Sequence, residues 1–477
     1  MDRIQDKKQL QHQLKRSISL FQAIMYGIGL ILGAGIYVIV GDVAGIAGNA
    51  MWISFIVAAF IALLTGFSYA ELSSIFPKSA AEYIFAKNAF GNDLAAAIIG
   101  CLIIFVAIVS AATVAVGFSQ YLHNIFLPEV STIIIAILLI SILSVVNFYG
   151  ISESIWINTI FTFVELVGLV IIIIAGLWFG SPSTVNYYEI PFKNNLSSHI
   201  AALGAILNSA GLIFFAYFGF ENIVNIADET KNPTRTIPKA LLVSIIATTI
   251  IYILVALSTS ALVGWKELSL SEAPLALVAE KAFGNQGVIM LSLIALFATA
   301  NTALMMLISG SRIIYGMARN AQDGNGNVEA SINSHQNSHF SNVFPLLLGT
   351  IHSSRKTPWI AIIVAMVCSM LAIGFSLGNI SAIANISVFG IFLVYASVNL
   401  CQILYRFKEP SAKRPFVAPL NIGKFPVLAA IGLTASLVML FQFNFEIVKG
   451  GFFVLAAITI LCLVLTRKNF YSIYTKK

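Results

Sequence analysis

Two acidic residues lie deep in apolar stretches of this sequence, where an ionised carboxylate is costly. Glu165 is in the middle of the apolar stretch 155–179, and Glu221 follows FFAYFGF near the end of the stretch 201–226. We expect no lysine, arginine or histidine deep enough to pair with either acid. An ionisable side chain at such a depth is functional by default. Each acid is therefore protonated at rest, because burial disfavours its charged form, or meets the charge of a transported cation, or is a neutral hydrogen-bonded core residue.

The composition indicates that these stretches cross a membrane. The chain has 477 residues, of which 58% are hydrophobic and 10% are charged, whereas about a quarter of the residues in a soluble domain are charged. A membrane span needs about 20 apolar residues. Twelve spans are predicted, at residues 20–41, 51–70, 94–119, 131–149, 155–179, 201–226, 239–263, 287–314, 358–376, 379–404, 425–443 and 447–466.

The basic residues indicate the orientation. Of the 27 lysines and arginines, 23 fall on the side of the two termini and 4 on the other side. By the positive-inside rule both termini are cytoplasmic, and we expect a multi-pass protein of the plasma membrane. The positive charge then follows from topology, so nucleic acid is not an expected partner. The four cysteines form no metal-site pattern, and we expect no metal and no other cofactor.

Glycines interrupt two of the spans. Gly33 and Gly35 flank one small residue in the first span, and Gly219 interrupts the sixth span just before Glu221. Glycine weakens a helix interior, although Gly33-x-Gly35 could instead permit close helix contact. The two segments cross the membrane in opposite directions. Glycine-interrupted segments at corresponding positions indicate an inverted repeat with a binding site near the midplane.

A break in a membrane helix leaves backbone groups without partners, and each costs several kcal/mol in hydrocarbon. The half-helix that begins near Gly35 would direct free N–H groups at an anion such as a carboxylate. The half-helix that ends near Ala216 would offer free carbonyl groups to an ammonium. Together the two breaks match the charged groups of an α-amino acid, which we predict as the substrate.

Five blocks of the sequence support this interpretation. They are GIGLILGAGIYV in the first span, YAELSSIFPKSAAEYIFAKNAFG at 69–91, FFAYFGFENIVNIADETKNPTRTIPKA at 214–240, SRIIYGMARNAQDG at 311–324 and RPFVAPL at 414–420. In type and order they resemble blocks of the amino acid, polyamine and organocation transporter superfamily, specifically its bacterial and archaeal amino acid permeases. The resemblance implies an all-α integral membrane protein with 12 transmembrane helices. It also implies a five-plus-five inverted repeat like that of the sodium-leucine symporter, discontinuous helices one and six, and two extra helices.

The resemblance also implies a substrate site in the unwound parts of helices one and six. The matching positions are Ile31, Gly33, Ala34, Gly35, Phe215, Ala216, Phe218 and Gly219. Phe215 or Phe218 would close over the substrate. In many proton-coupled relatives the fifth span carries a lysine that resembles the sodium ion of sodium-coupled relatives, but Glu165 stands at that place here. That mechanism cannot be carried over, and Glu165 and Glu221 become the candidates for coupling and gating.

The leading hypothesis is a carrier that moves amino acids by alternating access, coupled to protons or to counter-exchange. A sodium-coupled symporter is the nearest alternative, with hydroxyl ligands from Thr299, Thr302 and Ser309, and a polyamine or organocation carrier is another. An enzyme is disfavoured because all six histidines fall outside the spans or at their edges. A channel is disfavoured because the polar groups do not repeat along a pore-lining face. The two acids favour cationic or broadly neutral substrates.

The sequence divides into three parts. Residues 1–19 form a cytoplasmic tail, residues 20–404 form the inverted-repeat core, and residues 405–477 contain the last two spans and the C-terminal tail. The core includes a polar insertion at 319–357 that is rich in Asn, Ser and Gly, so we expect a mobile cytoplasmic loop there. No obligatory protein partner is evident, and the lipid bilayer is the expected surrounding.

Overall fold

The structure is a computed structural model, and it is almost entirely helical. It describes residues 14–181, 183–191, 198–271, 273–323, 344–376 and 380–474. The longer helices are α2 (Leu20–Ala47), α3 (Met51–Ile75), α5 (Asp93–Ile125), α6 (Thr132–Tyr149), α7 (Ile151–Phe179), α8 (Ser198–Tyr217), α9 (Pro233–Leu262), α12 (Asn285–Asp323), α13 (Trp359–Ser376), α14 (Ile380–Lys408), α15 (Val427–Leu440) and α16 (Phe445–Tyr474). The shorter elements are η1 (Gly48–Ala50), α4 (Ala81–Phe90), η2 (Phe220–Glu229), α10 (Trp265–Ser269), α11 (Pro274–Phe283), η3 (Leu346–Gly349) and the antiparallel strands β1 (Asn421–Ile422) and β2 (Phe425–Pro426).

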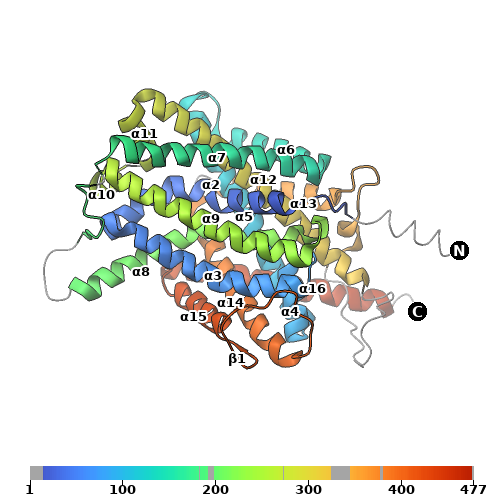
Figure 1. Ribbon diagram of the computed structural model, residues 1–477. Coiled ribbons are helices and arrows are strands. Elements are labelled where there is room, and N and C mark those ends of the chain that lie inside the picture. Colours follow the sequence, from blue (N-terminus) through green and yellow to red (C-terminus); the bar gives the residue numbers. More distant parts are fainter. Residues whose placement is uncertain are drawn as a thin grey trace.

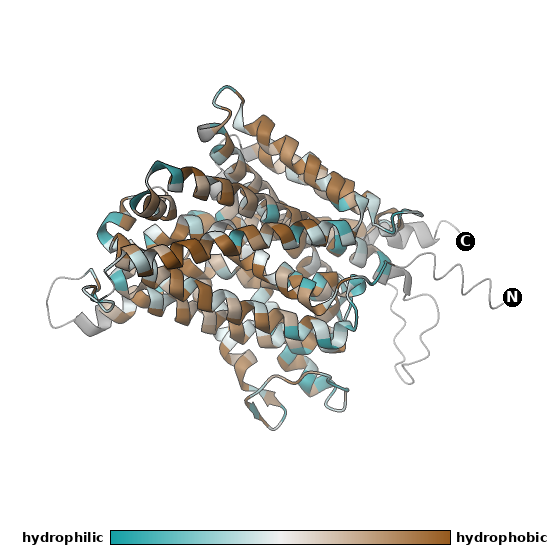
Figure 2. Ribbon diagram, turned by 45° about the horizontal axis from the view of Figure 1, so that its top comes forward, coloured by the Kyte–Doolittle hydropathy of each residue, from teal (hydrophilic) through white to brown (hydrophobic). Residues whose placement is uncertain are grey.

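Most of the long helices lie side by side in one bundle (Figure 1). Within the described residues, nine helical segments are both long and apolar enough to cross a membrane, and three shorter apolar segments lie in α8, α13 and α15. Figure 2 shows hydrophobic residues along the middle of the bundle and hydrophilic residues mainly towards its two ends. The expected all-helical, multi-span architecture is confirmed, while the count of twelve spans and the five-plus-five repeat stay predictions.

Helix α7 shows how the sequence divides between lipid and core. Trp156, Ile160 and Phe163 are spaced three and four residues apart, lie on one helical face, and are 60%, 56% and 53% exposed. The opposite face buries Thr162 and Glu165. Large apolar side chains are stable against lipid, whereas polar groups need protein partners. The polar residues of α7 therefore point into the bundle.

Helix α2 is interrupted where the sequence predicts a break. Gly33 has φ 5° and ψ −156°, which are not helical angles, so two half-helices meet at this residue. The first half begins at a capping box in which the Ser19 hydroxyl accepts from the N–H of Gln22 and the Gln22 side chain accepts from the N–H of Ser19. Such a box satisfies free N–H groups at a helix start. The first half-helix is thus anchored at one end and broken at the other.

The second predicted interruption is also present. Helix α8 ends at Tyr217, and η2 begins at Phe220 after Gly219, whose φ of 117° lies in the left-handed region that favours glycine. The chain continues beyond the break as a 3-10 helix and not as an α-helix. Gly219 is therefore required at this turn for its backbone conformation.

Helices α9 and α12 enclose the two breaks. Both pack against α2 and α7, and α12 also packs against α5. Helix α12 continues to Asp323, so residues 319–323 of the expected loop are helical, and η3 forms within the same insertion. Residues 324–343 of that loop lie outside the described residues. The frame around the breaks is thus built from helices distant in sequence.

Candidate functional site

A cavity of about 60 Å³ lies between the two breaks. Five of the eight predicted substrate-binding residues line it, namely Ile31, Gly33, Gly35, Ala216 and Phe218. Gly219 lies against α2, because a Cβ atom at this position would be 3.3 Å from the carbonyl oxygen of Leu30. The structure describes the backbone of Ala34 and Phe215 but not their side chains. The two predicted halves of the site are brought together.

Three further helices complete the cavity, and sequence reasoning did not assign their residues to a substrate site. They contribute Ser110, Thr113 and Val114 from α5, Thr302 and Met306 from α12, and Ala384 and Ser387 from α14. Small polar residues are common at helix interfaces in membranes, so no local signal separated these positions from packing residues. None of the described lining side chains is charged. One water needs about 10–15 Å³, so the cavity is the size of a small ligand.

Glycines allow the first break to approach its neighbours closely. A Cβ atom on Gly35 would lie 3.0 Å from the Cα atom of Ala216 and 3.2 Å from its Cβ atom. A Cβ atom on Gly33 would lie 2.5 Å from the Thr302 hydroxyl oxygen. Neither position accepts a side chain without displacement of the other wall. The spacing of these glycines therefore fixes the width of the cavity.

Tyr252 of α9 connects the two breaks, although it is absent from the cavity lining. Its hydroxyl oxygen is 2.5 Å from the carbonyl oxygen of Ile31 and 3.3 Å from that of Ala216. A phenol donates one proton, so the two carbonyl groups share a single donor. A buried carbonyl without a partner costs about 1–3 kcal/mol. Tyr252 therefore offsets part of the free-energy cost of the carbonyl groups left without helical partners at the breaks. It also holds the two breaks next to each other.

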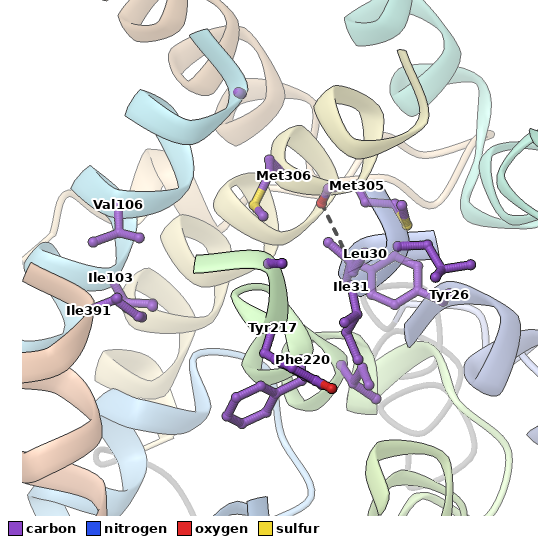
Figure 3. Packing of buried hydrophobic residues seen from close by; sticks show 14 of the residues in the cluster. Tyr26, Leu30, Ile31, Ile103, Val106, Tyr217, Phe220, Met305, Met306 and Ile391 are labelled. Atoms are coloured by element: carbon purple, nitrogen blue, oxygen red, sulfur yellow. Dashed lines mark hydrogen bonds between the residues drawn. The ribbon is translucent and has the colours of Figure 1, made fainter. Parts of the chain in front are cut away.

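The first half of α2 is also fixed to α12. Figure 3 shows Leu30 and Ile31 of α2 between the second break and α12, with Tyr217 and Phe220 on one side and Met305 and Met306 on the other. The Tyr26 hydroxyl donates to the carbonyl oxygen of Met305 at 3.3 Å, the bond drawn in the figure. These contacts make the wall of the cavity near the first break largely apolar.

Glu165 is fully buried at the centre of α7. Its Oε1 atom accepts from the Asn301 side chain at 3.1 Å, whereas its Oε2 atom has no partner. Asn301 also donates to Thr162 and accepts from Asn158, each at 3.0 Å. The Oδ1 atom of Asn158 has no partner either. None of the ion pairs formed among the described residues involves Glu165.

This polar cluster, formed by Glu165, Asn301, Thr162 and Asn158, adjoins the first half of α2. A Cβ atom on Gly29 would lie 2.2 Å from the Thr162 hydroxyl oxygen and 2.7 Å from the Asn301 side-chain nitrogen. Gly29 is one helical turn before the break at Gly33. The cluster therefore lies directly against the half-helix that leads into the cavity.

Glu221 adjoins the second break and is held entirely by neutral donors. Its Oε2 atom accepts from the backbone N–H of Gly219 at 3.0 Å and from the Tyr395 hydroxyl at 2.6 Å. Its Oε1 atom accepts from the Asn222 side chain at 2.9 Å. Because Tyr395 belongs to α14, these contacts connect the turn at Gly219 to that helix. The position of Glu221 suits a residue that controls movement at the break.

One deeply buried basic residue was not singled out from the sequence. Arg312 of α12 is inaccessible to solvent and pairs with Glu229 at the end of η2, with Nε–Oε2 and Nη2–Oε1 distances of 3.0 and 3.2 Å. The predicted eighth span ends close to Arg312, but α12 continues beyond it. Arg312 neutralises Glu229. It leaves Glu165 and Glu221 without a cation among the described residues.

Known proteins are similar to this sequence over most of its length. The chain matches the amino acid permease family over residues 18–321 and 328–466. A branched-chain amino acid permease of Bacillus subtilis is 27% identical over 438 residues, which are 88% of this chain and 86% of that protein. A methylthioribose transporter of the same organism is 27% identical, with 87% of each chain covered.

A more distant relative comes from a plant. A vacuolar cationic amino acid transporter of Arabidopsis thaliana is 26% identical over 422 residues, which are 84% of this chain and 64% of that protein. The names of these relatives describe transporters and permeases, in agreement with the predicted carrier and against an enzyme. The chain belongs to the amino acid permease family and is a membrane transporter of the superfamily that its sequence blocks resemble.

Proposed function

We propose that the protein carries neutral α-amino acids across the plasma membrane by alternating access. The cavity between the breaks, lined from both of them, is the observation that carries this proposal. The half-helix after Gly33 would bind the substrate carboxylate through its first N–H groups. Carbonyl groups near Ala216 would bind the ammonium. The lack of charge among the described lining side chains favours a neutral substrate side chain over a cationic one.

The comparisons support an amino acid substrate without choosing one. The named substrates of the relatives differ, and one of them is a permease for branched-chain amino acids. The cavity is small, and it suits a small aliphatic amino acid without movement of its walls. A larger side chain would require the breaks to separate. We therefore propose small and branched aliphatic amino acids as the substrates, in place of polyamines or other organic cations.

Binding to the purified protein tests this assignment. The thermal-unfolding midpoint is measured in detergent with each standard amino acid in turn. A ligand that binds only the folded state at 100 times its Kd stabilises it by about 2.7 kcal/mol. We expect alanine, valine or leucine to raise the midpoint, and lysine and arginine to leave it unchanged. A rise with the cationic amino acids alone would contradict the proposed substrate class.

We further propose a membrane arrangement of twelve spans, with a five-plus-five inverted repeat, two extra spans and both termini in the cytoplasm. The two glycine-containing breaks and the distribution of basic residues support this arrangement. Single cysteines at two exposed positions test it in intact cells. We expect Thr184→Cys to react with a membrane-impermeant thiol reagent and Ser354→Cys to react only after the cells are opened. Labelling of position 354 from outside would exclude the proposed orientation.

For coupling, we propose that Glu165 binds the transported proton and that Glu221 controls opening at the second break. Glu165 has one oxygen without a partner and no cation beside it. Protonation removes its buried charge and supplies a hydrogen-bond donor. A sodium ion could instead be held by the unpartnered oxygens of Glu165 and Asn158. Replacement of sodium by potassium at constant pH separates the two, because proton-coupled uptake would be unchanged.

A further inference from the structure

Besides Glu165 and Glu221, another buried acid has no ion pair among the described residues, and it lies outside the cavity and outside the roles proposed above. Glu82 is in the first turn of α4 and is inaccessible to solvent. Its carboxylate oxygens accept long hydrogen bonds from the Asn225 side chain, at 3.3 and 3.5 Å, and lie next to the Tyr69 hydroxyl. None of the ion pairs formed by the described residues includes Glu82. A carboxylate in this position is poorly compensated.

The turn before α4 is bound to η2, the segment that follows the second break. The N–H of Ala81 donates to the Asn225 side-chain oxygen at 3.1 Å, and the Ser79 hydroxyl donates to the Asn225 carbonyl oxygen at 2.9 Å. The N–H of Ser79 donates to an Asp228 carboxylate oxygen at 3.1 Å. We call residues 79–82 together with Asn225 and Asp228 the α4–η2 latch. Release of this latch would free the segment beyond the break.

Tyr69 of α3 lies next to both Glu82 and Glu221 and interacts electrostatically with each of them. Its hydroxyl is buried and is within reach of the Glu82 carboxyl group. Its ring packs edge-on against Phe220 and Tyr395, with centroid distances of 6.0 and 6.2 Å. A protonated Glu82 would be a donor, whereas an ionised one only accepts. The Tyr69 hydroxyl can therefore donate to an ionised Glu82 and accept from a protonated one.

The cations near Glu82 are already paired. Lys87 of α4 is 3.5 Å from Asp93, Arg406 of α14 pairs with Glu71, and Arg312 of α12 pairs with Glu229. Other titratable groups on the elements around Glu82 include Lys78 in the turn before α4, Tyr83 of α4, Tyr69 of α3, Glu221 and Asp228 of η2, Tyr315 of α12, and Tyr395, Cys401, Tyr405 and Lys408 of α14. Burial, together with the negative charge of Glu221, raises the pKa of Glu82 to about 7.

We propose that Glu82 is a proton-binding site that controls the α4–η2 latch. The proposal rests on the proposed transport function, because the latch holds the segment next to the substrate cavity. A hydronium ion in the water on the side of the chain termini gives one proton to the carboxylate: one O–H bond of the hydronium ion breaks, one O–H bond forms on Glu82, and a water molecule is left. The neutral acid stays buried and keeps the latch closed. Loss of the proton leaves a buried charge that is more stable in water, so the latch opens.

The direction of the pH effect follows from the difference in bound protons. In the closed latch the pKa of Glu82 is about 7, and an open, hydrated Glu82 would have its ordinary value of 4.5. Between these values the closed latch binds more protons than the open one. Its closed-to-open ratio therefore falls by up to about tenfold for each pH unit. The closed state is favoured fully below this window, and the preference is lost as the pH rises through 7.

Infrared difference spectroscopy tests the proton site without any substrate. Spectra of the purified protein are recorded below and above neutral pH. We expect a carboxylic-acid C=O band that disappears as the pH rises through about 7 and that loses amplitude in Glu82→Gln. Glu82→Asp keeps a titrating acid and should keep the band. Glu280→Gln, at an exposed position on α11, is the matched control and should match the wild type.

An undiminished band in Glu82→Gln, or no band that titrates near neutrality, would overturn the proton site. The latch is tested separately by leucine exchange in proteoliposomes at constant external pH. Raising the internal pH from about 6 to 7 should change the wild-type rate by up to about tenfold, and Glu82→Gln should lose the part of this change that Glu82 contributes. Equal pH dependence in both would overturn control of the latch. If the wild type exchanges no leucine, the proposed function fails for that substrate, and the infrared result still decides the proton site.

Discussion

Replacement of Gly35 by leucine is expected to abolish amino acid binding in a protein that still folds and inserts. A Cβ atom at this position already meets the Cα atom of Ala216 at 3.0 Å, so the remaining side-chain atoms must enter the cavity or force the breaks apart. The volume of the cavity is only about 60 Å³. Overpacking costs about 1–3 kcal/mol of stability, whereas binding should fall below detection because the ligand volume is gone.

The measurement is the leucine-induced rise of the thermal-unfolding midpoint, together with leucine uptake in proteoliposomes. Gly374→Leu is the matched control, because Gly374 is exposed on α13 and a Cβ atom there meets nothing within 4 Å. The control should bind and transport normally. Gly35→Ala should give an intermediate loss. Normal transport by Gly35→Leu would show that the substrate is held elsewhere.

Replacement of Glu165 by glutamine should separate exchange from accumulation. Glutamine keeps the shape of the side chain and an oxygen that can accept from Asn301, but it cannot bind a proton. Exchange of internal for external leucine needs no net proton movement and should survive. Accumulation driven by a proton gradient should be lost, and the pH dependence that Glu165 contributes should disappear. Both are measured with labelled leucine in proteoliposomes, with and without an imposed pH gradient.

A different role for Glu165 predicts a different pattern. If its charge neutralises a cationic substrate, Glu165→Gln should weaken lysine binding far more than alanine binding, because the ammonium would lose its buried partner. Glu221→Gln is the comparison variant, and we expect it to alter transport of every substrate alike because it acts on the break at Gly219. Wild-type accumulation, pH profile and substrate range in Glu165→Gln would make Glu165 a structural residue.

The breaks could be predicted from sequence because their cause is local. Glycine changes the backbone at its own position, so Gly33 and Gly219 indicate interruptions without knowledge of any neighbour. Glu165 and Glu221 can also be recognised from the sequence as candidate functional residues, since an acid in an apolar stretch is rare. Five of the eight positions carried over from the resemblance line one cavity. The family assignment followed from whole blocks of sequence, and the comparisons confirm it.

The remaining parts of the site depend on contacts between distant helices. Tyr252 and Ile31 are 221 positions apart in the chain, and Arg312 and Glu229 are 83 apart. A tyrosine in an apolar helix looks like any core aromatic until the helix packing is known. Arg312 lies near the end of the predicted span 287–314, and hydropathy does not show that α12 continues past it. The local sequence around these residues does not indicate their role in the site.

The position of Tyr252 has a consequence for how selectivity can evolve in this protein. One phenol proton serves the carbonyl groups of both breaks, yet Tyr252 is absent from the cavity lining. A substitution at this position would alter both halves of the site at once, and its effect would not add to that of a change at Gly35 or Ala216. Two homologues with the same lining residues can therefore differ in substrate preference, and libraries that vary only the lining would leave this epistatic position unexplored.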